Sequence, residues 1–416
     1  MFYPEPPLRA SPWPPPGAGP QLRPLTWRAE IPSSKAARNH RLCVSPALAG
    51  GGAVSARNCS TAAAIAAASE SEAAPETTSI LGRGGRRLPL VAIPLTLTSP
   101  AVSEVPIIDA EAVFAAVSPE AAIERTRLAF ERHAAGEWEM PAKVYLDSSP
   151  HGDFRAMPAR GDGLALLKWV TSFPHNPERG LPVVTGALLL SSAETGELLA
   201  IVDCASITSL RTGAGAAVSA QALARQDARS VGLIGCGVNG GWAARCLRAA
   251  GYGPGVCFDA QPEAAQRLAS ELGWSAGTRE DAAAQDVVVT VTPGERPVLG
   301  AADLRGGQHI AALGADAHGK AELEVAALEH CRLFCDDWAQ ASTGGELSGA
   351  VSAGLVTEES VTPIGEVLAG RASGRSSDED VTLFDSTGLA IQDLGIAAAV
   401  FERWREGRIE ASTVDL

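Results

Sequence analysis

The stretch Val231–Trp242 reads VGLIGCGVNGGW, a short apolar run followed by glycines at positions 235, 237 and 240. This spacing predicts a strand, a tight turn and a helix. Gly235 would permit the turn, Gly237 would let a pyrophosphate approach the backbone, and Gly240 would let the helix pack closely on the strand. Asp259 ends the next apolar run, at the distance typical of a dinucleotide site. The free N–H groups of the helix would then face the phosphates.

The same stretch indicates which dinucleotide binds. Asp259 would accept hydrogen bonds from the adenosine ribose, as in proteins that bind NAD. Gln261 lies two residues further on, and no Arg stands close by to meet a 2′-phosphate. NAD is therefore favoured, with NADP left open because a loop cation can come from elsewhere in the fold.

Apolar runs alternate with helical patterns after the glycine stretch. Strands are expected at 286–293, 307–315 and 332–337, and a helix at 262–273. Strands that alternate with helices favour a parallel, doubly wound sheet. Residues 229–379 are accordingly predicted to form a Rossmann-type dinucleotide-binding domain.

The segment before the glycine stretch has another pattern. A Ser-Pro helix start at 118–119 is followed by apolar strand candidates and by a helix expected from about Thr212; the strand candidates cover 143–147, 153–159, 165–173, 184–192 and 198–203. This favours a mostly antiparallel sheet with helices. A strand and helix at 383–407 are expected to return to it. The predicted fold class is α/β, with 104–228 and 380–416 forming a smaller sheet-and-helix domain.

Residues 1–103 differ in composition from the rest. They are rich in Pro, Gly, Ala and Ser and carry ten Lys or Arg against five Asp or Glu. Such a segment has no periodic apolar face to bury, so disorder is expected. A basic, Ser-rich leader is typical of organelle targeting, although its Pro-rich opening is not. A start codon placed too far upstream is the alternative. Without targeting, a cytoplasmic location is expected.

Composition excludes several function classes. The 416 residues have a formal net charge of −14, which argues against a nucleic-acid partner. No apolar run approaches the length of a membrane span. The eight cysteines lie without paired zinc-type spacing, so they are interpreted as reduced thiols and no metal is expected.

Four cations and one acid are candidates for a substrate site. Lys143, Arg155 and Lys168 fall on predicted strands, and Arg211 precedes the helix expected from Thr212. Clustered cations suit a small carboxylate, although each one is also explained as a solvated surface charge. Asp316 follows a glycine turn after a parallel strand. It is a candidate proton acceptor, with a plain helix cap as the alternative.

A series of motifs occurs in order between about residues 105 and 410: MPAKVYL, GDFRAMPA, LKWV, HNPERGLP, SLRTGA, GCG, GADAHGKAEL, DDWAQASTGGEL and FDSTGLAIQD. Together they resemble the ornithine cyclodeaminase/μ-crystallin family, and most of all its archaeal-type alanine dehydrogenase branch. The resemblance implies a homodimer in which the smaller domains pair. It leaves residues 1–103 uncovered.

The resemblance also implies roles for individual residues. Those on catalytic positions are Lys143, Lys168 and Asp316, and those on substrate-binding positions are Arg155 and Arg211. The cofactor positions are Thr212, Gly235, Gly237, Val238, Asn239, Gly240, Asp259, Thr292 and Ser386.

Two departures within the family bear on the reaction. By the resemblance, Arg155 stands at the position where the cyclodeaminase branch has an acidic residue that can hold the distal ammonium of a diamine. Ser342-Thr343 stand where the dehydrogenase branch often has a His. The first favours NAD-dependent oxidative deamination of a small L-amino acid such as alanine, or its reverse, over a diamine substrate. Ornithine cyclodeamination, reduction of a cyclic imine and crystallin-like binding of a nucleotide or hormone remain the alternatives.

Overall fold

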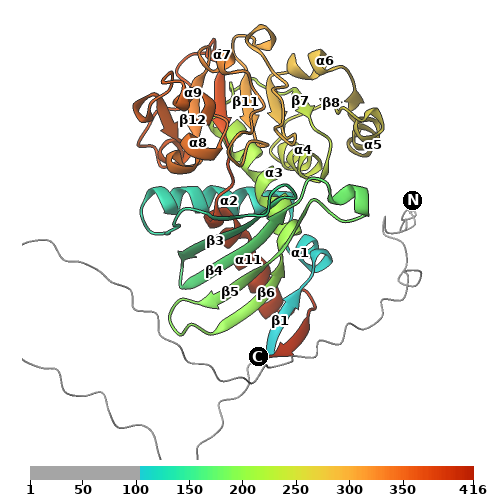
Figure 1. The fold of residues 1–416 in the computed structure, drawn as a ribbon, viewed down its shortest axis with the longest axis vertical. Coiled ribbons are helices and arrows are strands. Elements are labelled where there is room, and N and C mark those ends of the chain that lie inside the picture. The colour runs from blue at the N-terminus through green and yellow to red at the C-terminus, as the bar shows by residue number, and fades with distance from the viewer. Residues whose placement is uncertain (1–103) are drawn as a thin grey trace, which may run out of the picture. The chain divides into compact units, whose positions relative to one another are not determined.

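Two β-sheets organise the part of the chain that the computed structural model describes, residues 104–416. All of the described residues belong to one unit of this chain. The expected leader at 1–103 lies outside the described residues. Figure 1 shows the two sheets in separate lobes, with helix α3 extending from one lobe into the other.

The first sheet has seven strands in the order β15-β1-β6-β5-β4-β3-β2. Only β1 and β6 pair in parallel, so the expectation of a mostly antiparallel sheet is confirmed. In that order the strands are Ser412–Asp415, Glu104–Ile108, Leu198–Asp203, Val184–Ser192, Leu164–Ser172, Asp153–Gly161 and Val144–Asp147. Strands β1 and β15, which lie at one edge of the sheet, were not predicted from the sequence.

The second sheet has eight strands, all parallel, in the order β13-β12-β14-β11-β10-β7-β8-β9. They are Val361–Pro363, Arg332–Cys335, Thr382–Asp385, His309–Ala312, Val287–Thr290, Val231–Ile234, Gly255–Phe258 and Ser275–Ala276. The predicted Rossmann-type sheet is present. One boundary needs correction: β14 was assigned to the first domain, but it pairs with β11 and β12 inside the parallel sheet.

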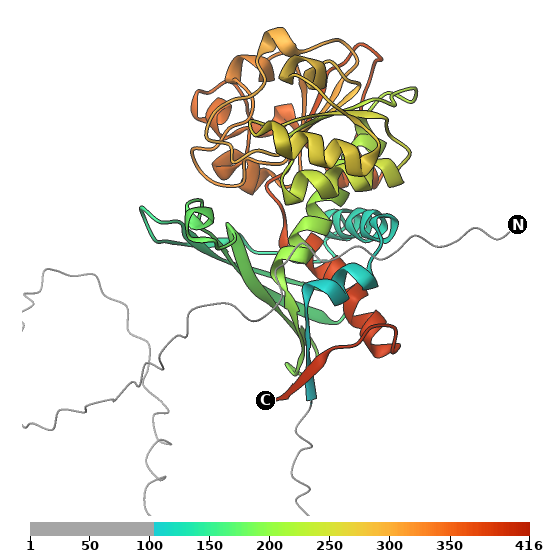
Figure 2. The same cartoon turned by 90° about the vertical axis from the view of Figure 1, so that its right-hand side faces the viewer.

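Eleven α-helices connect the strands in the described residues. They are α1 (Ala110–Ala116), α2 (Pro119–Ala134), α3 (Cys204–Leu223), α4 (Val238–Ala249), α5 (Pro262–Leu272), α6 (Arg279–Ala283), α7 (Val325–Leu328), α8 (Trp338–Gly344), α9 (Ser348–Ser352), α10 (Ile364–Leu368) and α11 (Ala390–Arg405). None of them is long and apolar enough to cross a membrane. Figure 2 shows α3 and α11 on one side of the antiparallel sheet, with the other side bare.

Helix α3 begins earlier than expected. The predicted start near Thr212 is wrong, because the carboxylate of Asp203 accepts the backbone N–H of Ser206 at 2.8 Å and caps a helix that begins at Cys204. Arg211 therefore lies within α3 instead of ahead of it. The hydroxyl of Ser219, near the other end of the same helix, forms a hydrogen bond with Nε2 of His309 on β11. Helix α3 therefore joins the two sheets.

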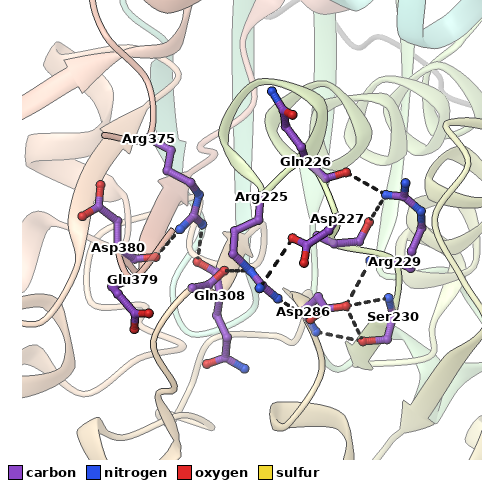
Figure 3. Close-up of polar contacts among 12 residues, drawn as sticks. Arg225, Gln226, Asp227, Arg229, Ser230, Asp286, Gln308, Arg375, Glu379 and Asp380 are labelled. Carbon is purple, nitrogen blue, oxygen red and sulfur yellow. Dashed lines mark hydrogen bonds and ion pairs between the residues drawn. The ribbon is translucent and has the colours of Figure 1, made fainter. Parts of the chain in front are cut away.

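A polar network closes the amino edge of the parallel sheet (Figure 3). The carboxylate of Asp286 accepts Arg225 Nη2 at 2.9 Å and the backbone N–H and hydroxyl of Ser230. Arg375 donates to the carbonyl oxygens of Leu223 and Gln308. These groups satisfy one another, which leaves the opposite, carboxyl edge of the sheet for a ligand, as is general for open parallel sheets.

Candidate functional site

The glycine loop between β7 and α4 has the geometry that its sequence predicts. Gly235 has a φ of +106°, and an added Cβ would lie 2.6 Å from the Val291 carbonyl oxygen. A Cβ on Gly240 would lie 2.0 Å from the Gly235 carbonyl oxygen, so only glycine fits where helix meets strand. An added Cβ on Gly237 meets nothing within 4 Å. This open space lies at the N-cap of α4, where N–H groups are free to bind phosphate.

Asp259 directly follows β8 and faces the glycine loop. One carboxylate oxygen accepts the backbone N–H of Cys236 at 2.7 Å and the other accepts that of Gln261 at 2.8 Å. Each oxygen keeps a lone pair for a further donor. A hollow of about 290 Å³ beside it is lined by Phe258, Pro262 and other side chains. The hollow can receive the flat base of a nucleotide, and the hydroxyls of the attached ribose then reach Asp259.

The other predicted cofactor residues border the same edge of the parallel sheet. Val238, next to Asn239, lies at the first turn of α4 and is 71 % exposed, so a ligand at the helix N-terminus can contact it. Thr292 follows β10, and Ser386 follows β14 and donates its N–H to the Ala312 carbonyl oxygen. Thr212 is buried on α3, and its hydroxyl has no hydrogen-bond partner among the described residues.

We expect Asp259→Ala to weaken NAD binding by about 1 to 3 kcal/mol, because a charged acceptor for the ribose is lost. Fluorescence titration with NADH measures the affinity, and circular dichroism checks that the fold is kept. Unchanged affinity in a folded variant would show that Asp259 serves only to hold the loop at Cys236.

Asp316 lies in the loop after β11, where it meets one cation from a distant strand and one from its own loop. One oxygen accepts Nη1 of Arg155 at 2.7 Å and the other accepts Nζ of Lys320 at 2.6 Å. Arg155 also donates to both oxygens of Asp153, and its guanidinium lies over the ring of Tyr145. The arrangement fixes Arg155 and Asp316 opposite each other. Asp316 keeps 34 % of its side-chain surface accessible, so a substrate can reach it.

Charge and burial set the protonation of this cluster. Burial opposes ionisation of Asp316, but Arg155 and Lys320 outweigh it and hold the pKa of the carboxyl well below its usual range. Burial lowers the pKa of Lys143 from 10.5 to about 8 against the pull of Asp316. Asp316 is therefore a permanent anion at neutral pH, and Lys143 is the group that can exchange a proton.

Lys143 and Arg211 approach the loop that follows β14. Nζ of Lys143 donates to the Thr387 carbonyl oxygen at 2.7 Å. Gly388 has a φ of +75°, and a Cβ there would lie 2.3 Å from Nη1 of Arg211. Both cations therefore meet at one turn, close enough for Arg211 to lower the pKa of Lys143.

Lys168 lies deeper than the other cations. Its ammonium donates to Oδ1 of Asp393 at 2.9 Å and to the Thr208 hydroxyl at 2.7 Å, and the side chains of Lys168 and Asp393 are 1 % and 0 % exposed. Nε of Arg211 lies 3.6 Å from the same Asp393 oxygen. The structure thus links Lys168 to Arg211 through one buried acid, and a direct contact of Lys168 with substrate stays a prediction.

Three acids near the site were missed by the sequence analysis. Asp393 is the one acid in the buried part of α11, Ala390–Phe401, which is a signal because a lone charge there needs a partner. Asp336 directly follows β12, the same kind of position that drew attention to Asp316. Glu322 accepts the backbone N–H groups of Thr292 and Gly314, and no local pattern reveals this contact.

The family model named ornithine cyclodeaminase/mu-crystallin family matches residues 106–408. The chain belongs to this family.

It is 44 % identical over 303 residues to the alanine dehydrogenase of Archaeoglobus fulgidus, covering 71 % of this chain and 94 % of the relative. It is 34 % identical over 301 residues to the iminosuccinate reductase of Paracoccus denitrificans, covering 69 % and 92 %. A solved archaeal alanine dehydrogenase dimer with bound NAD superposes with a TM-score of 0.72 at 42 % identity, covering 75 % of this chain and 99 % of that one. The resemblance drawn from the sequence motifs is confirmed.

Proposed function

We propose that this protein is an NAD-dependent dehydrogenase that deaminates a small L-amino acid, alanine or one close to it, to a 2-oxo acid and ammonia, or runs the reverse reaction. The observation that carries the proposal is the ion pair between Arg155 and Asp316. It sets a cation where a diamine substrate needs a free acid. The 44 % identity to an alanine dehydrogenase supports the same choice.

The residues of the cofactor side fit NAD. The open space at Gly237, the free N–H groups of α4, the exposed Val238 and the unused lone pairs of Asp259 match a pyrophosphate and an adenosine ribose. NAD, when bound there, accepts a hydride from the α-carbon of the substrate. The protein supplies the binding and the charge around that step.

Charge complementarity orients the substrate. Arg211 lies at the Thr387–Gly388 turn and presents its positive charge to the substrate carboxylate, and Lys143 lies at the same turn as the group that titrates. Asp316 stays anionic and faces the α-amine, whose positive charge grows as the carbon–nitrogen double bond forms. A preorganised anion at that place stabilises the developing cation.

Hydrolysis of the resulting imine requires a proton acceptor for water. Lys143 suits this role because burial brings the pKa of its ammonium to about 8, so a useful fraction is neutral near that pH. The neutral amine takes one proton from water as the oxygen attacks the α-carbon. The balanced reaction consumes the amino acid, NAD⁺ and water and yields the 2-oxo acid, ammonium, NADH and a proton.

A diamine is disfavoured by the same contacts. Both oxygens of Asp153 accept Arg155, and the two oxygens of Asp316 accept Arg155 and Lys320. A second substrate ammonium would meet carboxylates whose charges are already offset by Arg155 and Lys320, and these cations would repel it. This argues against ornithine as the substrate.

A substrate panel tests the proposal. Purified protein is incubated with NAD and either alanine or ornithine, and with NADH and either a cyclic imino acid or oxaloacetate plus ammonia. We expect NADH and pyruvate in equal amounts from alanine. Proline formed from ornithine without net NADH would identify a cyclodeaminase. Turnover confined to the imino acid or to oxaloacetate would identify a reductase, and cofactor binding without any turnover would favour the crystallin-like role.

The pH dependence follows from Lys143. Deprotonated Lys143 is the active form for deamination, so kcat/KM should rise as pH increases through about 8 and level off above it. Rates from pH 6 to 10 in a constant-ionic-strength buffer provide the profile. Lys143→Arg keeps the positive charge but has no amine that titrates near pH 8. It should abolish most activity and the rise of kcat/KM near pH 8. An unchanged rise of kcat/KM near pH 8 in this variant would show that another group titrates there.

The bare side of the antiparallel sheet supports a homodimer (Figure 2). Exposed apolar side chains lie there, including Val144, Leu146 and Trp169 at 62 %, 59 % and 42 % exposure, and Phe154 stacks on Trp169. An apolar patch of this kind is typical of a surface that another protein covers. A second copy of the chain is the proposed partner, in line with the dimeric archaeal structure. Light scattering that reports a single-chain mass would reject it.

A further inference from the structure

We propose that Asp336, which no catalytic step above uses, is a positioning residue of the site: its carboxylate holds the Thr387–Gly388 turn, and through that turn it holds the amine of Lys143 in place. The inference rests on the proposed function for its consequence in catalysis. The contacts that carry it are independent of the substrate.

Asp336 follows β12, and its carboxylate accepts hydrogen bonds from the turn after β14. Its Oδ2 accepts the backbone N–H of Gly388 at 2.8 Å, and the hydroxyl of Thr387 lies 3.1 and 3.3 Å from Oδ1 and Oδ2. The Thr387 carbonyl oxygen then accepts Lys143 at 2.7 Å. A single peptide segment thus connects the acid to the amine, and displacement of that segment moves the amine.

The contacts require a carboxylate. Oδ1 of Asp336 accepts the backbone N–H of Asp337 at 2.8 Å while Oδ2 accepts that of Gly388. An amide in this place would point its NH₂ group at one of the two N–H groups in either orientation, which leaves a buried donor unsatisfied. Asp336 is 4 % exposed, so water does not readily replace the lost acceptor.

The same turn also packs against the second substrate cation. Gly388 approaches Arg211 so closely that an added Cβ would lie 2.3 Å from Nη1. By fixing Gly388, Asp336 therefore limits where the guanidinium of Arg211 can lie. The positions of Lys143 and Arg211 therefore both depend on one buried acid.

Electrostatics adds a second effect. Lys143 faces two anions, Asp316 and Asp336, which raise its pKa, while burial and the cations Arg155 and Arg211 lower it, with about 8 as the result. Burial raises the pKa of Asp336 to about 6 against the pull of Lys143, and the nearby Asp337 acts in the same direction as burial. Asp385 is a further buried acid close to Asp336. Asp336 is therefore ionised wherever Lys143 titrates.

The test measures the titration of Lys143 without any substrate. Trace acetic anhydride labels neutral lysines, and peptide mass spectrometry at each pH reports the labelled fraction at Lys143. We expect a midpoint near pH 8 in the wild type and a midpoint about one unit lower in Asp336→Asn, because the variant removes one of two anions. Asp336→Glu keeps the charge and should restore most of the midpoint.

Asp337→Asn is the matched control. It makes the same charge change one residue away, and its side chain caps α8 by accepting the N–H of Gln340, which Asn does about as well. Its Lys143 midpoint should match that of the wild type. If Asp336→Asn does not fold, Thr387→Val removes the hydroxyl from Asp336 but keeps the carbonyl oxygen for Lys143, and it should lower the midpoint by a smaller amount.

The outcomes separate the two proposals. A midpoint that stays at the wild-type value in folded Asp336→Asn or in Thr387→Val overturns the inference, whatever the substrate is. An equal shift in Asp337→Asn also overturns it, because the effect would then be unspecific. A shifted midpoint in a protein that fails to oxidise alanine supports Asp336 as the positioning residue and rejects the proposed function alone.

Discussion

Asp316→Asn should lower kcat for alanine oxidation by about 10²-fold or more and leave NAD affinity nearly unchanged. The variant keeps the size of the side chain but removes the anion that faces the substrate amine. It also leaves Arg155 and Lys320 without the charge that each of them contacts, at 2.7 and 2.6 Å. Steady-state kinetics and a separate NADH titration measure the two effects.

Asp153→Asn is the control for this change. Asp153 accepts Arg155 from the other side, at 2.6 Å, so the substitution removes the same charge from the same guanidinium without touching the anion at the substrate. We expect an effect at least tenfold smaller. The helix-cap alternative for Asp316 is wrong, because the next helix begins at Val325 with Glu324 as its N-cap. A near wild-type rate in Asp316→Asn would therefore show that the side chain only holds Arg155 and Lys320 in place. Equal losses in both variants would point to Arg155 as the sensitive group.

Local patterns explain what could be predicted of the fold. The glycine loop and Asp259 were identifiable because the turn, the helix start and the ribose acceptor obey short-range spacing. The longer and more central strands of both sheets were recognisable as apolar runs, whereas the edge strands β1, β15, β9 and β13 were not. The start of α3 was misplaced because the small polar residues after Asp203 look like a loop, whereas Asp203 caps a helix whose first turns are buried.

The site itself depends on pairings that spacing does not encode. Arg155 and Asp316 were both singled out, but 161 residues separate them and only the tertiary fold makes them an ion pair. The ion pair changes the chemistry, since Asp316 considered alone is a plausible proton acceptor and beside two cations is a poor one. The protonation of Lys143 has the same origin, because its neighbours come from several elements.

Lys168→Met should lower the free energy of unfolding by about 3 kcal/mol, because it leaves Asp393 as a buried anion without its main partner. The ammonium of Lys168 lies 2.9 Å from Asp393, and both side chains are almost fully buried. Arg211, at 3.6 Å, offsets part of the loss and places the effect at the lower end of the range for such pairs. Urea unfolding followed by circular dichroism measures it.

The double variant Lys168→Met with Asp393→Asn decides whether Lys168 has more than this structural role. Removing both charges leaves no buried anion, so the double variant should lose less stability than the two single variants together. If Lys168 serves only the ion pair, KM for alanine in the double variant should follow the recovery in stability. If Lys168 also attracts the substrate carboxylate, as its family position implies, KM should stay at least tenfold above wild type in the stable double variant. Losses in stability that simply add would show that Lys168 and Asp393 are not coupled, and the buried pair would then have no part in holding Arg211.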